Sequence, residues 1–324
     1  MTGEARAFWL AYPGKGEIRT VALPDPAHDE VLVRTLHSGV SRGTETLVFR
    51  GGVPENQHRV MRAPYQEGDF PAPVKYGYLN VGVVEHGPPG LAGRTVFCLY
   101  PHQTRYVVPA AAVTVVPDAV PASRAVLAGT VETAVNAIWD AAPQIGDRIA
   151  VVGGGMVGCS VAGVLSRLPG ARVQLVDADP QRAAVAAALG VRFALPGDAD
   201  GDCDMVIHAS ATSAGLTRSL ELLAPEATVV ELSWYGDRPV SVPLGEYFHS
   251  RRLTVKSSQV GGIPPGRRRT YAQRLALALD LLADPAFDAL ITGHSDFEDL
   301  PEILPRLADG DLPALCHLVN YRGG

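Results

Sequence analysis

The pattern of hydrophobic and polar positions along the chain changes near residue 125. Before it, short β-branched runs separated by Gly, Pro and Asp predict strands, among them 31–36, 81–84 and 94–99. Residues 50–75 are polar and Pro-rich with little periodicity, which is typical of a functional loop. After residue 125, strand and helix patterns alternate at the spacing of βαβ units. This alternation predicts a parallel sheet covered on both faces.

Short apolar segments in this second region predict the six strands of a doubly wound dinucleotide fold. They are residues 148–153, 173–177, 191–194, 205–209, 228–232 and 254–258. Residues 269–282 have the periodicity of an amphipathic helix, and 288–291 with 315–320 return to mixed strand and helix. The sequence therefore predicts an α/β protein with a β-rich part and a Rossmann part.

Length and composition narrow the class of protein. A chain of 324 residues is too long for one ordinary core and fits two domains. The net charge of -6, with both signs interspersed, leaves no broad basic face for nucleic acid. The four cysteines show no C-x-x-C spacing, which suits a reducing compartment. Because neither a signal peptide nor an apolar run of about 20 residues is visible, we expect a soluble cytoplasmic protein without membrane contact.

Residues 149–158 read IAVVGGGMVG, a buried strand that runs into G-x-G-x-x-G and then a helix. Gly153 allows the tight turn, Gly155 lets a diphosphate approach the backbone, and Gly158 lets helix and strand pack closely. The helix that begins at Met156 and Val157 offers unpaired N–H groups to the diphosphate. This context predicts a nicotinamide dinucleotide site.

The expected cofactor is NAD(H), because Asp177 ends the next strand, 19 residues after Gly158. A carboxylate there binds the ribose hydroxyls and repels a 2′-phosphate. Arg182 either covers the adenosine or is a solvated helix residue. Further cofactor contacts are expected at the ends of the later strands, namely at Ala209, Ser210, Leu232 and Ser258.

Several stretches resemble the medium-chain dehydrogenase/reductase family across most of the chain. They read PAHDEVLV at 26–33, SGVSRGTE at 38–45, PVKYGYLNVGVV at 73–84, FDALIT at 287–292 and FEDLP at 297–301. The motif at 38–45 is most similar to the bacteriochlorophyllide hydroxyethyl dehydrogenase branch. The resemblance implies a GroES-like catalytic domain formed by residues 1–125 and 266–324, with a Rossmann NAD-binding domain at 126–265.

The chain departs from the family at its metal ligands. The positions that match the family's zinc-binding cysteine, histidine and third ligand are Ser41, Tyr78 and Gly129. A hydroxyl, a phenol and a glycine do not form a stable Zn²⁺ site. We therefore expect no metal. A shifted register remains the alternative, with zinc bound by other residues such as His37, His58, His86 or His102.

Without a metal, hydride transfer to a carbonyl needs a hydrogen-bond donor, and the reverse reaction needs a base. Tyr78 stands at a zinc-ligand position and could supply both, or could simply fill the volume of the metal. Glu45 matches the family's acidic residue after the first ligand, with Thr44 as a competitor. Ser41 with Thr44 could relay a proton to solvent, or both could be surface caps.

Two neighbours in one predicted helix complete the candidate residues. Thr133 matches a family residue that packs against the nicotinamide. Glu132 beside it lies among apolar residues, so its pKa is expected to be raised, as in acid–base groups. A helix N-terminal charge is the alternative. His102 and His249 are interpreted as structural histidines, and the arginines at 251–252 and 267–269 as solvated charge.

We therefore expect an NAD(H)-dependent oxidoreductase that interconverts a secondary alcohol and a ketone on a small, biosynthetic-type substrate. Two alternatives stay open: zinc-free reduction of a polarised C=C bond, and a non-catalytic NAD(H)-binding protein. The last Rossmann strand, 254–258, would be an exposed sheet edge, and such edges are normally covered or paired. The resemblance then implies a homodimer joined through these edges.

Overall fold

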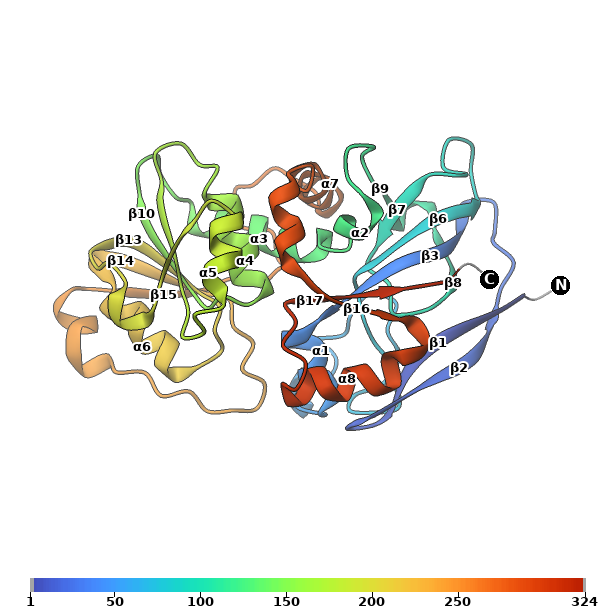
Figure 1. The fold of residues 1–324 in the computed structure, drawn as a ribbon, viewed down its shortest axis with the longest axis horizontal. Helices are drawn as coiled ribbons and strands as arrows, with labels where there is room; N and C mark the ends of the chain where they lie inside the picture. Colours follow the sequence, from blue (N-terminus) through green and yellow to red (C-terminus); the bar gives the residue numbers. More distant parts are fainter. Residues whose placement is uncertain (1–2, 323–324) are drawn as a thin grey trace. The chain divides into compact units, whose positions relative to one another are not determined.

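The fold is described from a computed structural model, in which residues 3–322 are described. The chain forms two compact units, one of Met1–Gly129 with Ile291–Gly324 and the other of Thr130–Leu290 (Figure 1). Residues 266–290, which the family resemblance assigned to the first domain, belong to the second unit, and residues 126–129, which it assigned to the second domain, belong to the first unit. The physical reason is that Arg274 bonds to Glu132, and Gly163 lies close to Phe287.

Two sheets build the first unit within the described residues. The smaller sheet has the strand order β2-β1-β5-β4, with β2 Lys15–Leu23, β1 Gly3–Tyr12, β5 Val74–Lys75 and β4 Glu67–Gly68. The larger has the order β16-β17-β3-β6-β7-β9, and β8 also pairs with β3. Its strands are β16 Ile291–Asp296, β17 Cys316–Asn320, β3 Glu30–Ser41, β6 Asn80–His86, β7 Thr95–Cys98, β9 Thr114–Val115 and β8 Arg105–Pro109.

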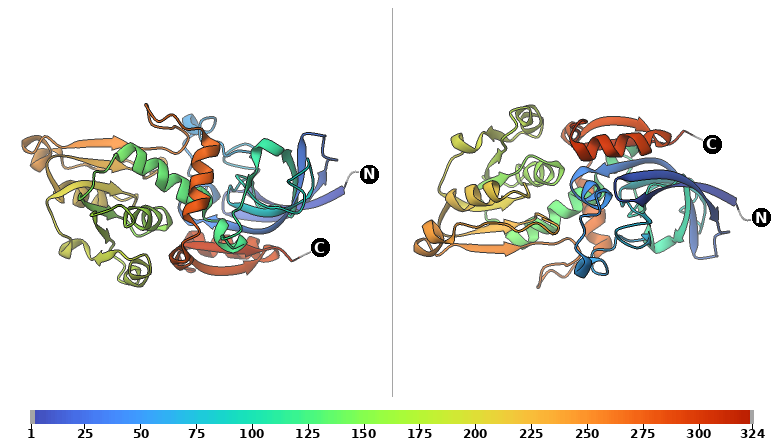
Figure 2. Two further views of the ribbon diagram at one scale, coloured as in Figure 1. Left: turned by 90° about the horizontal axis from the view of Figure 1, so that it is seen from above. Right: turned by 90° about the horizontal axis from the view of Figure 1, so that it is seen from below.

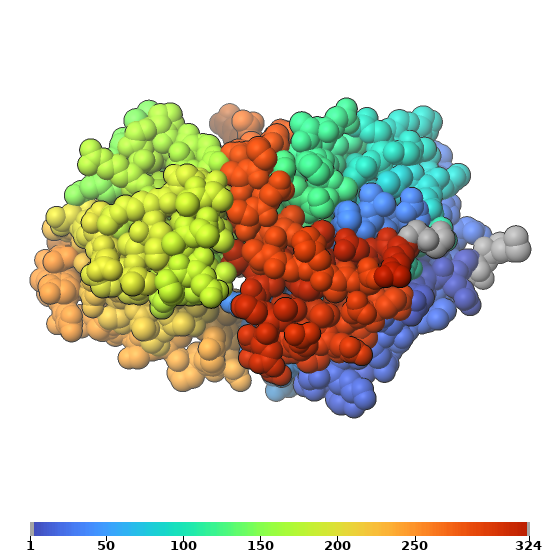
Figure 3. Space-filling view, viewed as in Figure 1, coloured from blue at the N-terminus to red at the C-terminus, as the bar shows by residue number. Residues whose placement is uncertain are grey.

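The two ends of the chain meet in this unit. Strand β17 pairs antiparallel with β3, so that Cys316 lies opposite Ser41. Helix α8, Leu300–Asp309, packs against β2 and against α1, Arg42–Phe49. In Figure 3 the C-terminal residues, coloured red, lie directly against the blue N-terminal strands. The remaining helical segments of the unit are η1 Glu55–Gln57, η2 Ala110–Ala112, α2 Ala122–Ala125 and η6 Phe297–Asp299.

A parallel sheet forms the centre of the second unit, and all six predicted strands are present in it. Within the described residues its order is β12-β11-β10-β13-β14-β15, the order of a doubly wound dinucleotide fold. The strands are β12 Arg192–Ala194, β11 Arg172–Val176, β10 Arg148–Val152, β13 Cys203–His208, β14 Leu223–Glu231 and β15 Thr254–Ser257. The central strands are apolar and buried because helices cover both faces.

Helices lie on opposite faces of this sheet (Figures 1 and 2). Val151 of β10 faces α4, Met156–Leu165, while Ala150 and Val152 pack with Leu216 of α6, Ser213–Glu221. The other helical segments are α3 Ala128–Ala141, α5 Arg182–Ala188, η3 Pro196–Asp198, η4 Leu244–Phe248, α7 Tyr271–Leu281 and η5 Pro285–Leu290. No helix among residues 3–322 is long and apolar enough to cross a membrane.

Candidate functional site

Five residues predicted to contact the cofactor lie along one edge of the second unit's sheet, where the parallel strands end. Each follows its strand directly, and its N–H donates to the carbonyl of a neighbouring strand. These bonds run from Gly153 to Val176, from Asp177 to Ala194, from Ala209 to Val152, from Leu232 to His208 and from Ser258 to Glu231. This carboxyl edge is where open α/β sheets bind their ligands.

The glycine-rich turn after β10 has the geometry that a dinucleotide requires. Gly153 has a φ of 111°, and a Cβ there would lie 2.6 Å from the nitrogen of Ser210. A Cβ at Gly158 would lie 1.8 Å from the carbonyl oxygen of Gly153, so only glycine permits this helix–strand approach. Gly155 is the N-cap of α4, and a Cβ on it would meet no atom within 4 Å. Met156 and Val157, the first residues of α4, therefore follow a backbone position that has open space beside it.

Asp177 lies beside this turn, as the sequence predicts. Its Oδ2 accepts a hydrogen bond from the N–H of Gly154 at 2.5 Å, and its Oδ1 accepts one from Asp179 at 2.8 Å. Arg182 is close to the same backbone, because a Cβ at Gly154 would lie 3.1 Å from its Cγ. Its guanidinium pairs with Asp179 across 3.3 Å, and its side chain is 13% exposed. Arg182 is therefore packed over the turn rather than solvated.

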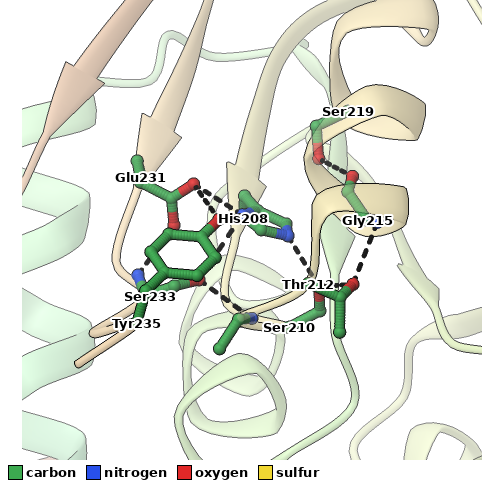
Figure 4. A network of polar contacts seen from close by, with 9 residues as sticks. His208, Ser210, Thr212, Gly215, Ser219, Glu231, Ser233 and Tyr235 are labelled. Carbon is green, nitrogen blue, oxygen red and sulfur yellow. Dashed lines mark hydrogen bonds and ion pairs between the residues drawn. The ribbon is translucent and has the colours of Figure 1, made fainter. Parts of the chain in front are cut away.

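A polar network that the sequence analysis missed occupies the ends of β13 and β14 (Figure 4). His208 and Glu231 are paired residues in the strand register, and their Nδ1 and Oε2 atoms are 2.6 Å apart. The Nε2 of His208 is also 2.6 Å from the Oγ of Ser210. The sequence signal was partial, because each residue is a polar position that follows a short apolar run, residues 205–207 before His208 and 229–230 before Glu231.

The first unit brings together three of the predicted catalytic residues. The side chains of Ser41 and Thr44 form hydrogen bonds with the phenol of Tyr78. Burial and then the charge of Glu45 raise the pKa of Tyr78 to about 12, although the two hydroxyl bonds lower it. The phenol therefore keeps its proton at neutral pH and can act as a hydrogen-bond donor.

Glu45 is the centre of a second buried network in this unit. Its Oε1 accepts the N–H of Ser41 at 2.8 Å, and its Oε2 is 2.8 Å from Nε2 of His102. The Nδ1 of His102 is 2.7 Å from the Oγ of Ser38, which is 2.9 Å from the hydroxyl of Tyr321. Both carboxylate oxygens are thus occupied, so Glu45 is placed to fix the backbone that carries Ser41.

Glu132 lies elsewhere, in a buried ion pair of the second unit. Its Oε1 accepts a hydrogen bond from Nε of Arg274 at 3.0 Å, and the two side chains are 6% and 2% exposed. Burial raises the pKa of Glu132 more than Arg274 lowers it. The pKa is therefore raised, which is the expected direction.

Thr133 follows in α3 and is half-buried. Ser258 donates to Oδ2 of Asp140 at 2.6 Å.

The three positions that match zinc ligands do not fit a metal. Ser41 and Tyr78 offer only hydroxyl groups, which Zn²⁺ does not favour. Gly129 offers no side chain to a metal, and a Cβ there would crowd a methyl group of Leu79 at 2.7 Å. Among residues 3–322, no cluster of three or more His, Cys, Asp or Glu side chains is suited to a metal.

The histidines named as alternative zinc ligands do not form a cluster, and three of them lie within hydrogen-bond distance of other protein groups. His102 faces Glu45, His37 lies 3.0 Å from Oδ1 of Asn320, and His58 lies 3.0 Å from the carbonyl of Val53. His86 is exposed at the end of β6. Of the arginine clusters, Arg251 donates to Leu223, Arg252 pairs with Glu226, and residues 267–269 are exposed.

Solved structures share this fold, although no family model and no curated relative matches the sequence. L-idonate 5-dehydrogenase from Escherichia coli matches with a TM-score of 0.80 at 15% identity, over 99% of each chain. An Escherichia coli alcohol dehydrogenase complexed with NADH matches with 0.77 at 18% identity, over 98% of this chain and 99% of that one. A Sinorhizobium meliloti dehydrogenase, described as zinc-binding and bound to NADP, matches with 0.78 at 16%, over the same shares.

These matches confirm the predicted fold, a GroES-like unit with a Rossmann unit. The glycine turn, the open N-terminus of α4 and the carboxylate of Asp177 fit a nicotinamide dinucleotide. The residues that would hold it are Gly153, Gly155, Met156, Val157 and Gly158 for the diphosphate, and Asp177 for the adenosine ribose.

Proposed function

We propose that this chain is an NAD(H)-dependent oxidoreductase that interconverts a secondary alcohol and a ketone without catalytic zinc. The observation that carries the proposal is the turn of Gly153–Gly158 at the carboxyl edge, with Asp177 beside it. Asp177 has one oxygen on Gly154 and one on Asp179. A carboxylate at this place accepts ribose hydroxyls and repels a 2′-phosphate, which favours NAD(H) over NADP(H).

We assign proton transfer to Tyr78. The nicotinamide ring, when bound, supplies or accepts the hydride. In ketone reduction Tyr78 donates its hydroxyl hydrogen to the oxygen of the substrate, and Ser41 and Thr44, which bond to the phenol, relay a proton from solvent back to it. In alcohol oxidation the proton moves in the opposite direction. A phenol with a pKa of about 12 is protonated throughout the neutral range, which is the form that ketone reduction requires.

The other residues of the two networks have supporting roles in this proposal. Glu45 is a positioning residue, because its carboxylate accepts the backbone N–H of Ser41 rather than bonding to a group that faces the substrate. Glu132 is structural, since Arg274 occupies its carboxylate. The absence of a metal in the proposal follows from the donor set of Ser41 and Tyr78 and from the crowding at Gly129.

A homodimer is also proposed. All four residues of the edge strand β15 are exposed, including Val255 at 41%. An exposed parallel edge with an apolar side chain is normally covered, and a two-fold pairing of identical edges is the simplest cover. Light scattering should therefore give twice the mass of the 34.2 kDa chain. A monomer at micromolar concentration would remove this part of the proposal.

Turnover with a substrate panel tests the proposed activity. The wild-type protein is first titrated with NADH, and the hydride transfer is then followed at 340 nm with secondary alcohols, ketones and enones. Reaction with alcohols and ketones supports the proposal. Reaction with enones alone would instead indicate a C=C reductase, and saturable binding without any turnover would indicate a non-catalytic NAD(H)-binding protein.

A further inference from the structure

The network at the ends of β13 and β14 has no role in the function proposed above. His208 is completely buried, and the side chain of Glu231 is 13% exposed. The two residues are register partners on adjacent strands, so the sheet itself fixes their separation. Figure 4 shows their side chains converging with those of Ser210 and Tyr235. A buried histidine paired with a carboxylate at a ligand-binding edge calls for a functional explanation.

Three groups of this network form hydrogen bonds with the carboxylate of Glu231. Its Oε2 accepts from His208 and, at 3.0 Å, from the hydroxyl of Tyr235, while its Oε1 accepts the N–H of Ser233 at 2.7 Å. Burial would raise the pKa of Glu231, but the bonds from His208 and Ser233 lower it below its usual value. The carboxylate is therefore ionised, and it holds the imidazole of His208 through Nδ1.

This arrangement holds the hydroxyl of Ser210 in place. Its Oγ lies 2.6 Å from Nε2 of His208 and 2.9 Å from Oγ1 of Thr212, and Thr212 accepts the N–H of Gly215 at 3.0 Å. A hydroxyl group can donate one hydrogen bond and accept two, so Ser210 keeps capacity for one further partner.

The position of Ser210 in the sheet indicates which part of a bound dinucleotide its hydroxyl would contact. In the strand order, β10 lies between β11 and β13, so Asp177 and Ser210 follow the strands on either side of the glycine turn. The backbone of Ser210 lies against Gly153, where a Cβ would approach its nitrogen to 2.6 Å. With the diphosphate at the turn and the adenosine ribose at Asp177, the second riboside extends over β13 and β14.

We propose that His208 and Glu231 are positioning residues that hold Ser210 Oγ in place as the hydrogen-bond partner of a hydroxyl of the nicotinamide-side ribose. This inference rests on the proposed dinucleotide binding and adds a recognition element for its second half. Gly215 belongs to the same device, because a Cβ on it would lie 2.1 Å from Ser210 Oγ and 2.8 Å from Nε2 of His208. Only glycine leaves room for this hydroxyl.

Calorimetric titration with ADP, ADP-ribose and NADH tests the inference, because only the last two carry the second ribose. Ser210→Ala and His208→Gln should raise the Kd for ADP-ribose and NADH about threefold to tenfold, the effect of one hydrogen bond. The Kd for ADP should stay within twofold. Ser219→Ala is the matched control, since this buried serine bonds only to Gly215 within α6 and should change none of the three affinities.

Three results would overturn the inference. Equal weakening of ADP, ADP-ribose and NADH would show that the network is merely structural. Weakening of NADH alone would place the contact on the nicotinamide and not on the ribose. Unchanged affinities in Ser210→Ala would remove the contact altogether, while unchanged ADP affinity confirms that each variant is folded. Failure of the wild-type protein to bind ADP or NADH would instead contradict the proposed function itself.

Discussion

Glu132 accepts a hydrogen bond from Arg274 across 3.0 Å, between helices α3 and α7 of the second unit. The guanidinium also donates to Asn136 and, at 2.7 Å, to the carbonyl of Val260. A carboxylate with such a partner stabilises the packing of α7 and does not need a catalytic role to explain its burial. The pair gives the first prediction.

Glu132→Gln should lower the free energy of unfolding by about 3–5 kcal/mol, because it leaves the charge of Arg274 buried without its partner. The double variant Glu132→Gln with Arg274→Met should recover part of that loss, as a double-mutant cycle from urea unfolding would show. A catalytic Glu132 would behave in the opposite way, with turnover abolished by Glu132→Gln and stability unchanged.

Tyr78→Phe should lower kcat by roughly 10²–10⁴-fold, the range for one acid–base group. The Kd for NADH should stay the same, because the proposed dinucleotide site lies in the other unit. Steady-state kinetics and a fluorescence titration measure the two quantities. Tyr76→Phe is a suitable control, since Tyr76 stands edge-on to Tyr78 at 6.0 Å but is not assigned proton transfer. Near-full activity of Tyr78→Phe would show that the phenol only fills space.

The purified protein should carry no stoichiometric zinc, and a chelator should leave its turnover unchanged. The physical reason is the donor set at Ser41 and Tyr78, together with the lack of space beside Gly129. Elemental analysis of the protein after expression with added zinc gives the answer. One zinc per chain would require ligands other than these three residues.

Stability should fall as the pH drops from 6.5 to 4, in part because of His317. Burial, and then the charges of His294 and His102, lower the pKa of His317 from 6.5 to about 4. The unfolded chain therefore takes up this proton more readily than the folded chain, which costs up to about 3 kcal/mol at the acid end. The stability associated with the uncharged, buried His317 is fully present above pH 6.5.

Urea unfolding at pH 7 and pH 4.5 measures this loss. His317→Gln should show a smaller decrease between the two values than the wild-type protein. His86→Gln, which changes an exposed histidine of β6, should retain the wild-type decrease. An unaltered pH dependence in His317→Gln would mean that other groups account for it.

Local patterns were sufficient to predict the second unit. The central strands β10, β11 and β13 contain short apolar runs, and the turn at Gly153 holds glycines that the backbone requires. Asp177 was predicted as a cofactor contact because its place relative to such a turn is fixed by the βαβ unit. Tyr78, Ser41 and Thr44 were predicted together because the resemblance places Ser41 and Tyr78 at metal-ligand positions and Thr44 beside the family's acidic residue. Their catalytic roles stay predictions.

Contacts between distant residues were not predictable from local pattern. Glu132 and Arg274 are 142 positions apart, and Glu45 and His102 are 57 apart. Their pairing depends on how helices and strands pack, which a single sequence does not specify. His208 and Glu231 are an intermediate case, because both lie one position before the end of a predicted strand, but their adjacency requires the strand order of the sheet.

Fluorescence titration with NADH and NADPH tests the central claim most directly. The account predicts saturable binding of NADH at least tenfold tighter than that of NADPH, because the carboxylate of Asp177 opposes a 2′-phosphate. Asp177→Ala should reduce this ratio, while Asp204→Ala, at the start of β13, should leave it unchanged. Equal affinities, a preference for NADPH or no binding of either dinucleotide would contradict the account.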